Sequence, residues 1–161
     1  MAKAILICGK LCSGKTTYCN RLISERGGVL LSCDEITLQL FDGDLGEKHD
    51  DMVERIKRYL LKKAAEITAN GVDVLLDWGF WRKSDRKAAR DFFSSHGIES
   101  ELHYLEVPDE LWRSRIEQRN QAVECGEVSA YYVDEGLMKK FEGMFEAPEP
   151  SETDILVKSH G

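Results

Sequence analysis

The sequence predicts an α/β domain in which a parallel β-sheet carries helices on both faces. Three observations favour this fold class. Short apolar runs alternate with stretches of helical periodicity along the whole chain. The first run, residues 4–8, is apolar throughout, which is typical of a parallel strand that is buried on both faces. The chain has 161 residues, of which 42% are hydrophobic, and this suits one domain with a buried core.

Five apolar runs indicate the strands of this sheet. They cover residues 4–8, 29–31, 72–76, 102–107 and 155–157. At least one stretch of helical periodicity separates each run from the next. This alternation of strand and helix predicts a five-stranded parallel sheet.

The helical stretches are identified by apolar residues at three- and four-residue spacing. Two of them are followed by a glycine, Gly71 or Gly97, which is a common stop just after a helix. Residues 120–132 show no clear period, so we expect a mobile loop there. Helices are expected over residues 17–26, from residue 35, over 47–70, 85–96 and 108–119, and around 137–145 before Pro148.

Charge and hydropathy argue against several classes of protein. The formal net charge of −7 disfavours a protein that holds extended nucleic acid, although a local basic pocket for a few phosphates is compatible with it. No stretch approaches the roughly 18 apolar residues of a membrane span, so no membrane partner is expected. The apolar run at 4–8 is too short for a signal peptide, and we expect a cytoplasmic protein.

The cysteines and histidines do not predict a zinc site or a disulfide framework. The five cysteines are an odd number without a C-x-x-C pair, and no histidine stands at ligand spacing from them. Cys12 is interpreted as a small filler of its loop, with redox control as a second interpretation. The histidines are scattered, and we expect all of them at the surface: His49, His96, His103 and His160.

One motif indicates a specific chemistry. Residues 9–16 match the pattern G-x-x-x-x-G-K-[ST] between a buried strand and a helix, which is the setting in which this pattern binds phosphates. Its glycines let the backbone N–H groups point at phosphate oxygens, and the helix N-terminus adds a positive dipole end. Lys15 is expected to reach the β- and γ-phosphates and the Thr16 hydroxyl to ligate Mg²⁺. The predicted nucleoside triphosphate site consists of Gly9, Lys10, Leu11, Cys12, Ser13, Gly14, Lys15, Thr16 and Thr17.

With four further segments, this motif resembles a known family. Together with the motif segment GKLCSGKTT (9–17), the four are LSCDEI (31–36), LLDWGFWRKSDR (75–86), HYLEVPDELWRSRIEQRN (103–120) and MKKFEGMFEAPEP (138–150). In them the chain resembles small P-loop kinases grouped as AAA-domain-like ATP-binding proteins, which are relatives of chloramphenicol phosphotransferase, zeta toxin and polynucleotide 5′-kinase. The resemblance implies a single three-layer P-loop NTPase domain, residues 1–161, with strand order 2-3-1-4-5. It also implies a small lid at about residues 113–132 and phosphoryl transfer from ATP.

Asp34 follows the second predicted strand, where carboxyl ends of parallel strands line a ligand crevice. Relatives with hydroxyl acceptors carry an aspartate here as the base, and an attacking alcohol must indeed lose its proton. The alternative is that Asp34 caps the helix expected from Glu35. We favour the base.

Asp77 ends the third predicted strand, in the position of an acid that holds Mg²⁺ through water. It is also similar to the aspartate before the acceptor-binding turn of nucleoside monophosphate kinases, where an arginine comparable to Arg82 contacts the acceptor phosphate. Trp78, Phe80 and Trp81 could stack on a flat acceptor, although aromatic residues beside a core more often pack. The predicted acceptor site consists of Asp34, Asp77, Trp78, Trp81 and Arg82.

Arg115 and Arg119 form an i, i+4 pair of like charges, which is unfavourable on a helix unless an anion or acid lies nearby. Related kinases use lid arginines in this segment to clamp the transferring phosphoryl group. The alternative is a solvated face, with Glu110 and Glu117 as partners, and it suits Arg113 better than Arg119. We expect Arg115 and Arg119 to act in catalysis together with Lys15 and Asp34.

These residues predict an ATP-dependent kinase for a small-molecule hydroxyl acceptor. A polynucleotide 5′-hydroxyl kinase is the nearest alternative, and the net charge of −7 disfavours it. A regulatory module that binds ATP without transferring phosphate is an alternative of another class. Such a module would have little use for Asp34 and the paired arginines. The sequence leaves the acceptor, the choice between ATP and GTP, and the oligomeric state open.

Overall fold

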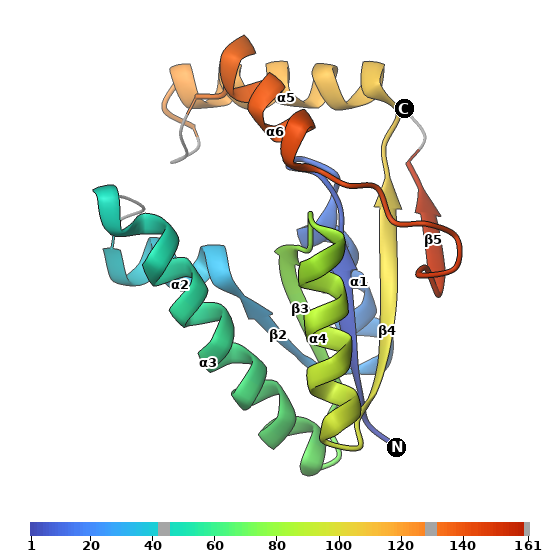
Figure 1. Ribbon diagram of the computed structural model, residues 1–161. Helices are drawn as coiled ribbons and strands as arrows, with labels where there is room; N and C mark the ends of the chain where they lie inside the picture. The colour runs from blue at the N-terminus through green and yellow to red at the C-terminus, as the bar shows by residue number, and fades with distance from the viewer. Residues whose placement is uncertain (42–45, 128–131, 160–161) are drawn as a thin grey trace.

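The sheet is the one that the sequence predicts. In a computed structural model, which describes residues 1–41, 46–127 and 132–159, five parallel strands form one sheet in the order β2-β3-β1-β4-β5 (Figure 1). The α/β fold class and the strand order implied by the resemblance are therefore confirmed. The strands are β1 (Lys3–Cys8), β2 (Val29–Ser32), β3 (Val74–Gly79), β4 (Glu99–Glu106) and β5 (Ile155–Lys158).

Helices cover both faces of this sheet. In Figure 1, α3 and α4 lie in front of the sheet and α1 lies behind it, while α5 and α6 lie beyond the carboxyl ends of β1 and β4. No helix within the described ranges is both long and apolar enough to cross a membrane. The helices are α1 (Lys15–Arg26), α2 (Cys33–Phe41), the 3₁₀ helix η1 (Gly46–Lys48), α3 (His49–Ala69), α4 (Lys83–Ser95), α5 (Asp109–Glu124) and α6 (Glu135–Met144).

The central strand β1 explains the continuous apolar run at its position. Leu6 and Cys8 pack into the core shared with α3 and α4, whereas Ile5 and Ile7 pack against α1. Because successive side chains of a strand point to opposite faces, a central strand needs apolar residues at every position. The sheet therefore holds β1, and the loop that follows it, rigidly between two cores.

The prediction of a loop over residues 120–132 is wrong for residues 120–124, because α5 continues to Glu124. Trp112, Ile116 and Asn120 follow one another at four-residue spacing and are all buried. Asn120 Nδ2 donates to the Val133 carbonyl (2.7 Å), and the Val133 N–H donates to Asn120 Oδ1 (2.8 Å). A polar residue thus occupies a core position of the helix and hides its period. Residues 128–131 lie outside the described residues.

The surface position expected for His103 is also wrong, because its side chain is 0% exposed. On β4 it points toward α1, where its Nδ1 lies 2.8 Å from Tyr18 Oη, while its Nε2 lies 3.0 Å from Glu101 Oε2. Burial lowers the pKa of His103, although Glu101 acts in the opposite direction. His49 and His96 are exposed as expected, and His160 lies outside the described residues.

Candidate active site

The loop between β1 and α1 has the backbone that a phosphate loop requires. Cys12 and Gly14 adopt positive φ angles of 59° and 89°. A Cβ on Gly9 would collide with Ser13 Oγ and lie 3.3 Å from the Leu105 carbonyl oxygen, so a larger residue would force the loop to shift. Gly14 is the N-cap of α1 and has no side chain to occupy the first N–H groups of the helix. These groups are therefore available to an anion, and the loop fits the phosphates of a nucleotide.

Lys15 folds back over this loop. Its Nζ donates hydrogen bonds to the carbonyl oxygens of Gly9 (3.2 Å) and Lys10 (2.7 Å). Burial lowers the pKa of Lys15, whereas the carboxylates of Asp77 and Asp34 act in the opposite direction. The ammonium group is thus within electrostatic reach of both predicted acids.

Asp77 lies inside the sheet at its carboxyl edge. It is paired in register with Ile7 of β1 and with Ser32 of β2, and it is 7% exposed. Burial raises the pKa of Asp77, while the nearby Lys15 ammonium lowers it. The carboxylate therefore lies beside the loop lysine at the point where β3 passes the end of β1.

Asp34 is exposed in the first turn of α2. The cap of this helix is Ser32, whose Oγ accepts a hydrogen bond from the backbone N–H of Glu35 (3.2 Å). The alternative that Asp34 caps the helix is therefore wrong. Its carboxylate is available for another role.

The turn after β3 packs its aromatic residues in three different ways. Phe80 is 2% exposed and therefore has no surface to offer an acceptor. Trp78 is half-buried and stacks on Phe80, with ring centroids 5.1 Å apart. Trp81 donates its indole N–H to the Gly9 carbonyl of the phosphate loop (3.0 Å), and its ring meets Phe141 edge-on. Arg82 is exposed at the start of α4.

A buried arginine of α4 was not predicted from the sequence. Arg86 is 1% exposed, and its Nη1 donates to the carbonyl oxygens of Phe80 (2.9 Å) and Glu146 (2.9 Å). Its Nε donates to Glu152 Oε1 at 3.0 Å. The signal was its spacing: Arg86 lies on the same stripe of α4 as the buried Ala89 and Phe93.

Of three arginines on α5, two contact the phosphate loop and one contacts α6. Arg115 Nη1 donates to the Cys12 carbonyl (3.3 Å), and Arg119 Nη1 lies 3.5 Å from Cys12 Sγ. Arg113 faces α6 instead, where it forms ion pairs of 3.3 and 3.4 Å. The structure thus brings Arg115 and Arg119 to the phosphate loop. The partners of Arg113 are Glu135 and Glu142.

A cavity of about 650 Å³ lies beside the phosphate loop, on the side of α5. Its walls include Thr17, Arg115 and Arg119, together with Tyr18 and Val157. This volume falls within the roughly 300–1,000 Å³ of small-molecule sites. The cavity is continuous with the loop residues that would hold phosphates, so it is the candidate position for the nucleoside.

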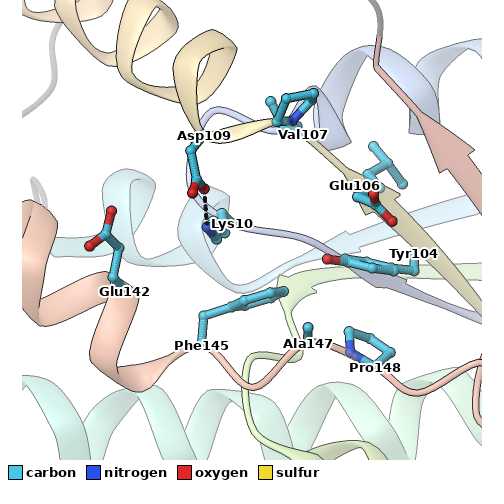
Figure 2. A pocket seen from close by; sticks show the side chains of 11 residues that line it. Lys10, Tyr104, Glu106, Val107, Asp109, Glu142, Phe145, Ala147 and Pro148 are labelled. Atoms are coloured by element: carbon cyan, nitrogen blue, oxygen red, sulfur yellow. Dashed lines mark hydrogen bonds and ion pairs between the residues drawn. The ribbon is translucent and has the colours of Figure 1, made fainter.

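The side chain of Lys10 lies apart from the cavity beside the phosphate loop. Its side chain reaches a second cavity of about 580 Å³, where its Nζ lies 3.4 Å from Asp109 Oδ1 (Figure 2). The ammonium group also lies over the ring of Trp112, 4.7 Å from the centroid. Tyr104 and Phe145 supply aromatic walls. Only the backbone of Lys10 remains for the nucleotide.

The predicted magnesium ligands fit a metal that the substrate helps to hold. Thr16 is exposed in the first turn of α1, and Asp77 lies near Lys15. Within residues 1–41, 46–127 and 132–159, no group of three or more His, Cys, Asp or Glu side chains could hold a metal ion. Mg²⁺ is usually bound by one or two carboxylates, waters and substrate phosphates, so Thr16 and Asp77 remain its predicted ligands.

The fold and the loop define a P-loop domain of the α/β class. Residues 5–148 match the family described as AAA domain. The chain therefore belongs to this AAA domain family, which confirms the resemblance. A search of curated proteins finds no match.

Solved structures share the fold over almost the whole chain. A sugar kinase from Janibacter sp. HTCC2649 is 19% identical with a TM-score of 0.68, and a putative kinase from Chloroflexus aurantiacus is 17% identical with a TM-score of 0.74. In both comparisons 98% of this chain and 86% of the other are covered. The Mycobacterium tuberculosis APS kinase CysC, in complex with AMPPNP and APS, is 18% identical with a TM-score of 0.65, over 99% of this chain and 90% of that one. The fold is that of P-loop kinases.

Proposed function

We propose that the chain is an ATP-dependent kinase that transfers the γ-phosphoryl group to a hydroxyl of a small molecule. The observation that carries the proposal is that the carboxylates of Asp34 and Asp77 both act electrostatically on Lys15 of the phosphate loop. Arg115 and Arg119 reach the same loop from α5. Cations that hold phosphates and an exposed carboxylate are the groups that phosphoryl transfer to an alcohol needs. The sugar kinase and APS kinase among the structural neighbours favour the same class.

In the proposed reaction, Asp34 accepts the proton of the acceptor hydroxyl. The acceptor oxygen then forms a bond to the γ-phosphorus, the bond to the β–γ bridging oxygen breaks, and ADP leaves. Lys15 turns from the Gly9 and Lys10 carbonyls to the β- and γ-phosphate oxygens, while Arg115 and Arg119 balance the charge of the transferring group. Mg²⁺ held by Thr16 and Asp77 would supply further neutralisation of the phosphates.

The residues proposed to surround the acceptor lie on α2, on β3 and at the start of α4. Asp34 is exposed on α2, and Arg82 is exposed at the start of α4. Trp78 is half-buried, so one part of its ring remains available to an acceptor. We propose that the acceptor lies among these residues and Asp77. Trp81 contributes less directly, because its N–H is already bonded to Gly9.

The test is Asp34→Asn, and Lys15→Ala is measured beside it as a variant that removes the phosphate-binding charge. Turnover is measured by ADP release over a panel of alcohols, sugars and nucleosides, and ATP binding by calorimetry. Asp34→Asn should lower turnover about 10²–10⁴-fold, the usual contribution of a general base, with little change in ATP affinity. Lys15→Ala should lower turnover by about 10²–10³-fold while the fold is retained.

Three outcomes would contradict the proposal. Unchanged turnover in Asp34→Asn would remove the base and favour an acceptor that needs no deprotonation, such as a monophosphate. Stoichiometric ATP binding without transfer to any member of the panel would favour the regulatory module. Transfer to a 5′-hydroxyl oligonucleotide, and to no small molecule, would favour the polynucleotide kinase.

A further inference from the structure

Two indole groups donate hydrogen bonds to the phosphate loop from different parts of the fold. Trp81, in the turn after β3, donates its Nε1–H to the Gly9 carbonyl at 3.0 Å. Trp112, in the first turns of α5, donates its Nε1–H to the Leu11 carbonyl at 2.7 Å. The two tryptophans come from distant parts of the sequence, yet both end on carbonyl oxygens of the same short loop. We call Trp81 and Trp112 the indole pair.

The geometry of the peptide bond links these contacts to phosphate binding. A peptide unit is planar, and its C=O and N–H groups point in opposite directions. A donor that fixes the Gly9 carbonyl therefore also fixes the N–H of Lys10. In the same way, the bond to the Leu11 carbonyl fixes the N–H of Cys12. A loop that turns its N–H groups toward phosphates must turn its carbonyls away from them, and each outward carbonyl needs a donor.

Both indoles are themselves held in place. Trp112 is 0% exposed and packs in a cluster with Ile116 and Met138. Trp81 meets Phe141 of α6 edge-on, with ring centroids 5.2 Å apart. An indole is a rigid group with a single donor and no acceptor, so its N–H direction is set once its ring is packed. The cores on either side thereby fix the direction of the loop carbonyls.

The Gly9 carbonyl shows why a permanent donor matters. It accepts two hydrogen bonds, one from Trp81 Nε1 and one from Lys15 Nζ (3.2 Å). When Lys15 turns to the phosphates in the proposed reaction, it leaves this carbonyl. Trp81 then remains as the donor that keeps the peptide in its orientation.

We propose that Trp81 and Trp112 are positioning residues that preorganise the N–H groups of the phosphate loop for nucleotide binding. The inference deepens the proposed function and rests on its nucleotide site. It needs no statement about the acceptor. Trp78 is the matched control, because it lies in β3 close to Trp81 in the sequence but stacks on Phe80, with ring centroids 5.1 Å apart.

The first test replaces each tryptophan in turn by benzothienylalanine, which keeps the shape of the ring system and has sulfur in place of the N–H. The Kd of AMPPNP with Mg²⁺ is then measured by calorimetry and the thermal midpoint by scanning. Replacement at position 81 or 112 should weaken AMPPNP binding about 3- to 10-fold, the effect of one lost hydrogen bond. Replacement at 78 should change it less than about 2-fold. If the three variants bound AMPPNP with the same Kd, the inference would be overturned.

The second test uses the unmodified protein, uniformly labelled with ¹⁵N so that indole and loop amide signals are both observed. The chain has three tryptophans and therefore three indole N–H signals. On addition of AMPPNP with Mg²⁺ the Trp81 signal should move, because Lys15 leaves the carbonyl that Trp81 shares with it, while the Trp78 signal should stay. A Trp81 signal that stays while the loop amides move would contradict the inference. Indole-dependent binding of AMPPNP, combined with no transfer from ATP to any acceptor of the panel, would refute the kinase proposal and leave the inference about the indole pair intact.

Discussion

Replacing Arg86 by methionine should destabilise the protein strongly. Arg86 is buried between the turn after β3 and the segment that follows α6, and its guanidinium bonds Phe80, Glu146 and Glu152. Methionine keeps most of the stem but leaves two carbonyls without this donor and one carboxylate without its cation. Breaking a buried ion pair on one side costs about 3–5 kcal/mol. Because the Glu152 side chain is 18% exposed, we expect the lower end, about 3 kcal/mol.

The assay is thermal unfolding followed by calorimetry and circular dichroism. For a chain of this size, about 3 kcal/mol corresponds to a fall in Tm of about 6–12 °C. Arg82→Met, an exposed position just before α4, is the control and should change stability by less than about 0.5 kcal/mol. A fall of less than about 2 °C in Arg86→Met would refute the argument that this guanidinium ties the two segments together.

The stability that the Arg86–Glu152 pair contributes should depend on pH in a direction that the pKa of Glu152 determines. Burial alone would raise the pKa of Glu152, but the hydrogen bond from Arg86 and further partners lower it overall, below the ordinary value of 4.5. The pair therefore stabilises the folded chain above pH 4.5, and this stabilisation is lost as the pH falls through the lowered pKa. The difference in Tm between the wild type and Arg86→Met, measured by thermal unfolding over a pH series, should therefore become smaller below pH 4.5.

Three further predictions concern single residues. Arg119→Ala should lower kcat more than it weakens ATP binding, because its contact strengthens as charge shifts in the transition state; an unchanged kcat with a raised KM would make it a ground-state contact. Since burial lowers the pKa of His103, the unfolded chain takes up this proton first, so Tm should fall as the pH drops below 6.5. His103→Gln should show a flatter Tm between about pH 5 and that value, and an equal slope would refute the assignment. Ser32→Ala should cost about 1 kcal/mol by removing the cap of α2, whereas Ser32→Asn should retain it, both measured by thermal unfolding.

The sheet and the phosphate loop could be predicted because their signals are local. The run at residues 4–8 is apolar at every position, which a strand covered on both faces requires. The loop that follows it is specified by two glycines and Lys15 at fixed spacing. Strand β3 was harder to delimit, since it runs on past its apolar residues. Asp77 and Gly79 still pair with Ile7 and Cys8 of β1.

What escaped prediction are polar residues at core positions. Asn120, His103 and Arg86 each occupy a place on a helix or strand where periodicity expects an apolar side chain. Their burial depends on partners far away in the sequence: Val133 for Asn120, Tyr18 for His103 and the segment around residue 146 for Arg86. Hydrophobic patterning does not encode such partners, because a buried polar group is stabilised by hydrogen bonds whose other half lies elsewhere.

The strand order also arranges the charges around the phosphate loop, and this bears on the proposed reaction. In the order β2-β3-β1-β4-β5, Asp34 and Asp77 lie at the ends of β2 and β3, on one side of the loop after β1. Arg115 and Arg119 belong to α5, which follows β4 on the other side. A nucleotide that enters the cavity lined by these arginines would place its terminal phosphate at Lys15, between cations behind it and carboxylates in front. An acceptor beside Asp34 would then face that phosphate from the side opposite to the leaving group, the direction that in-line transfer requires.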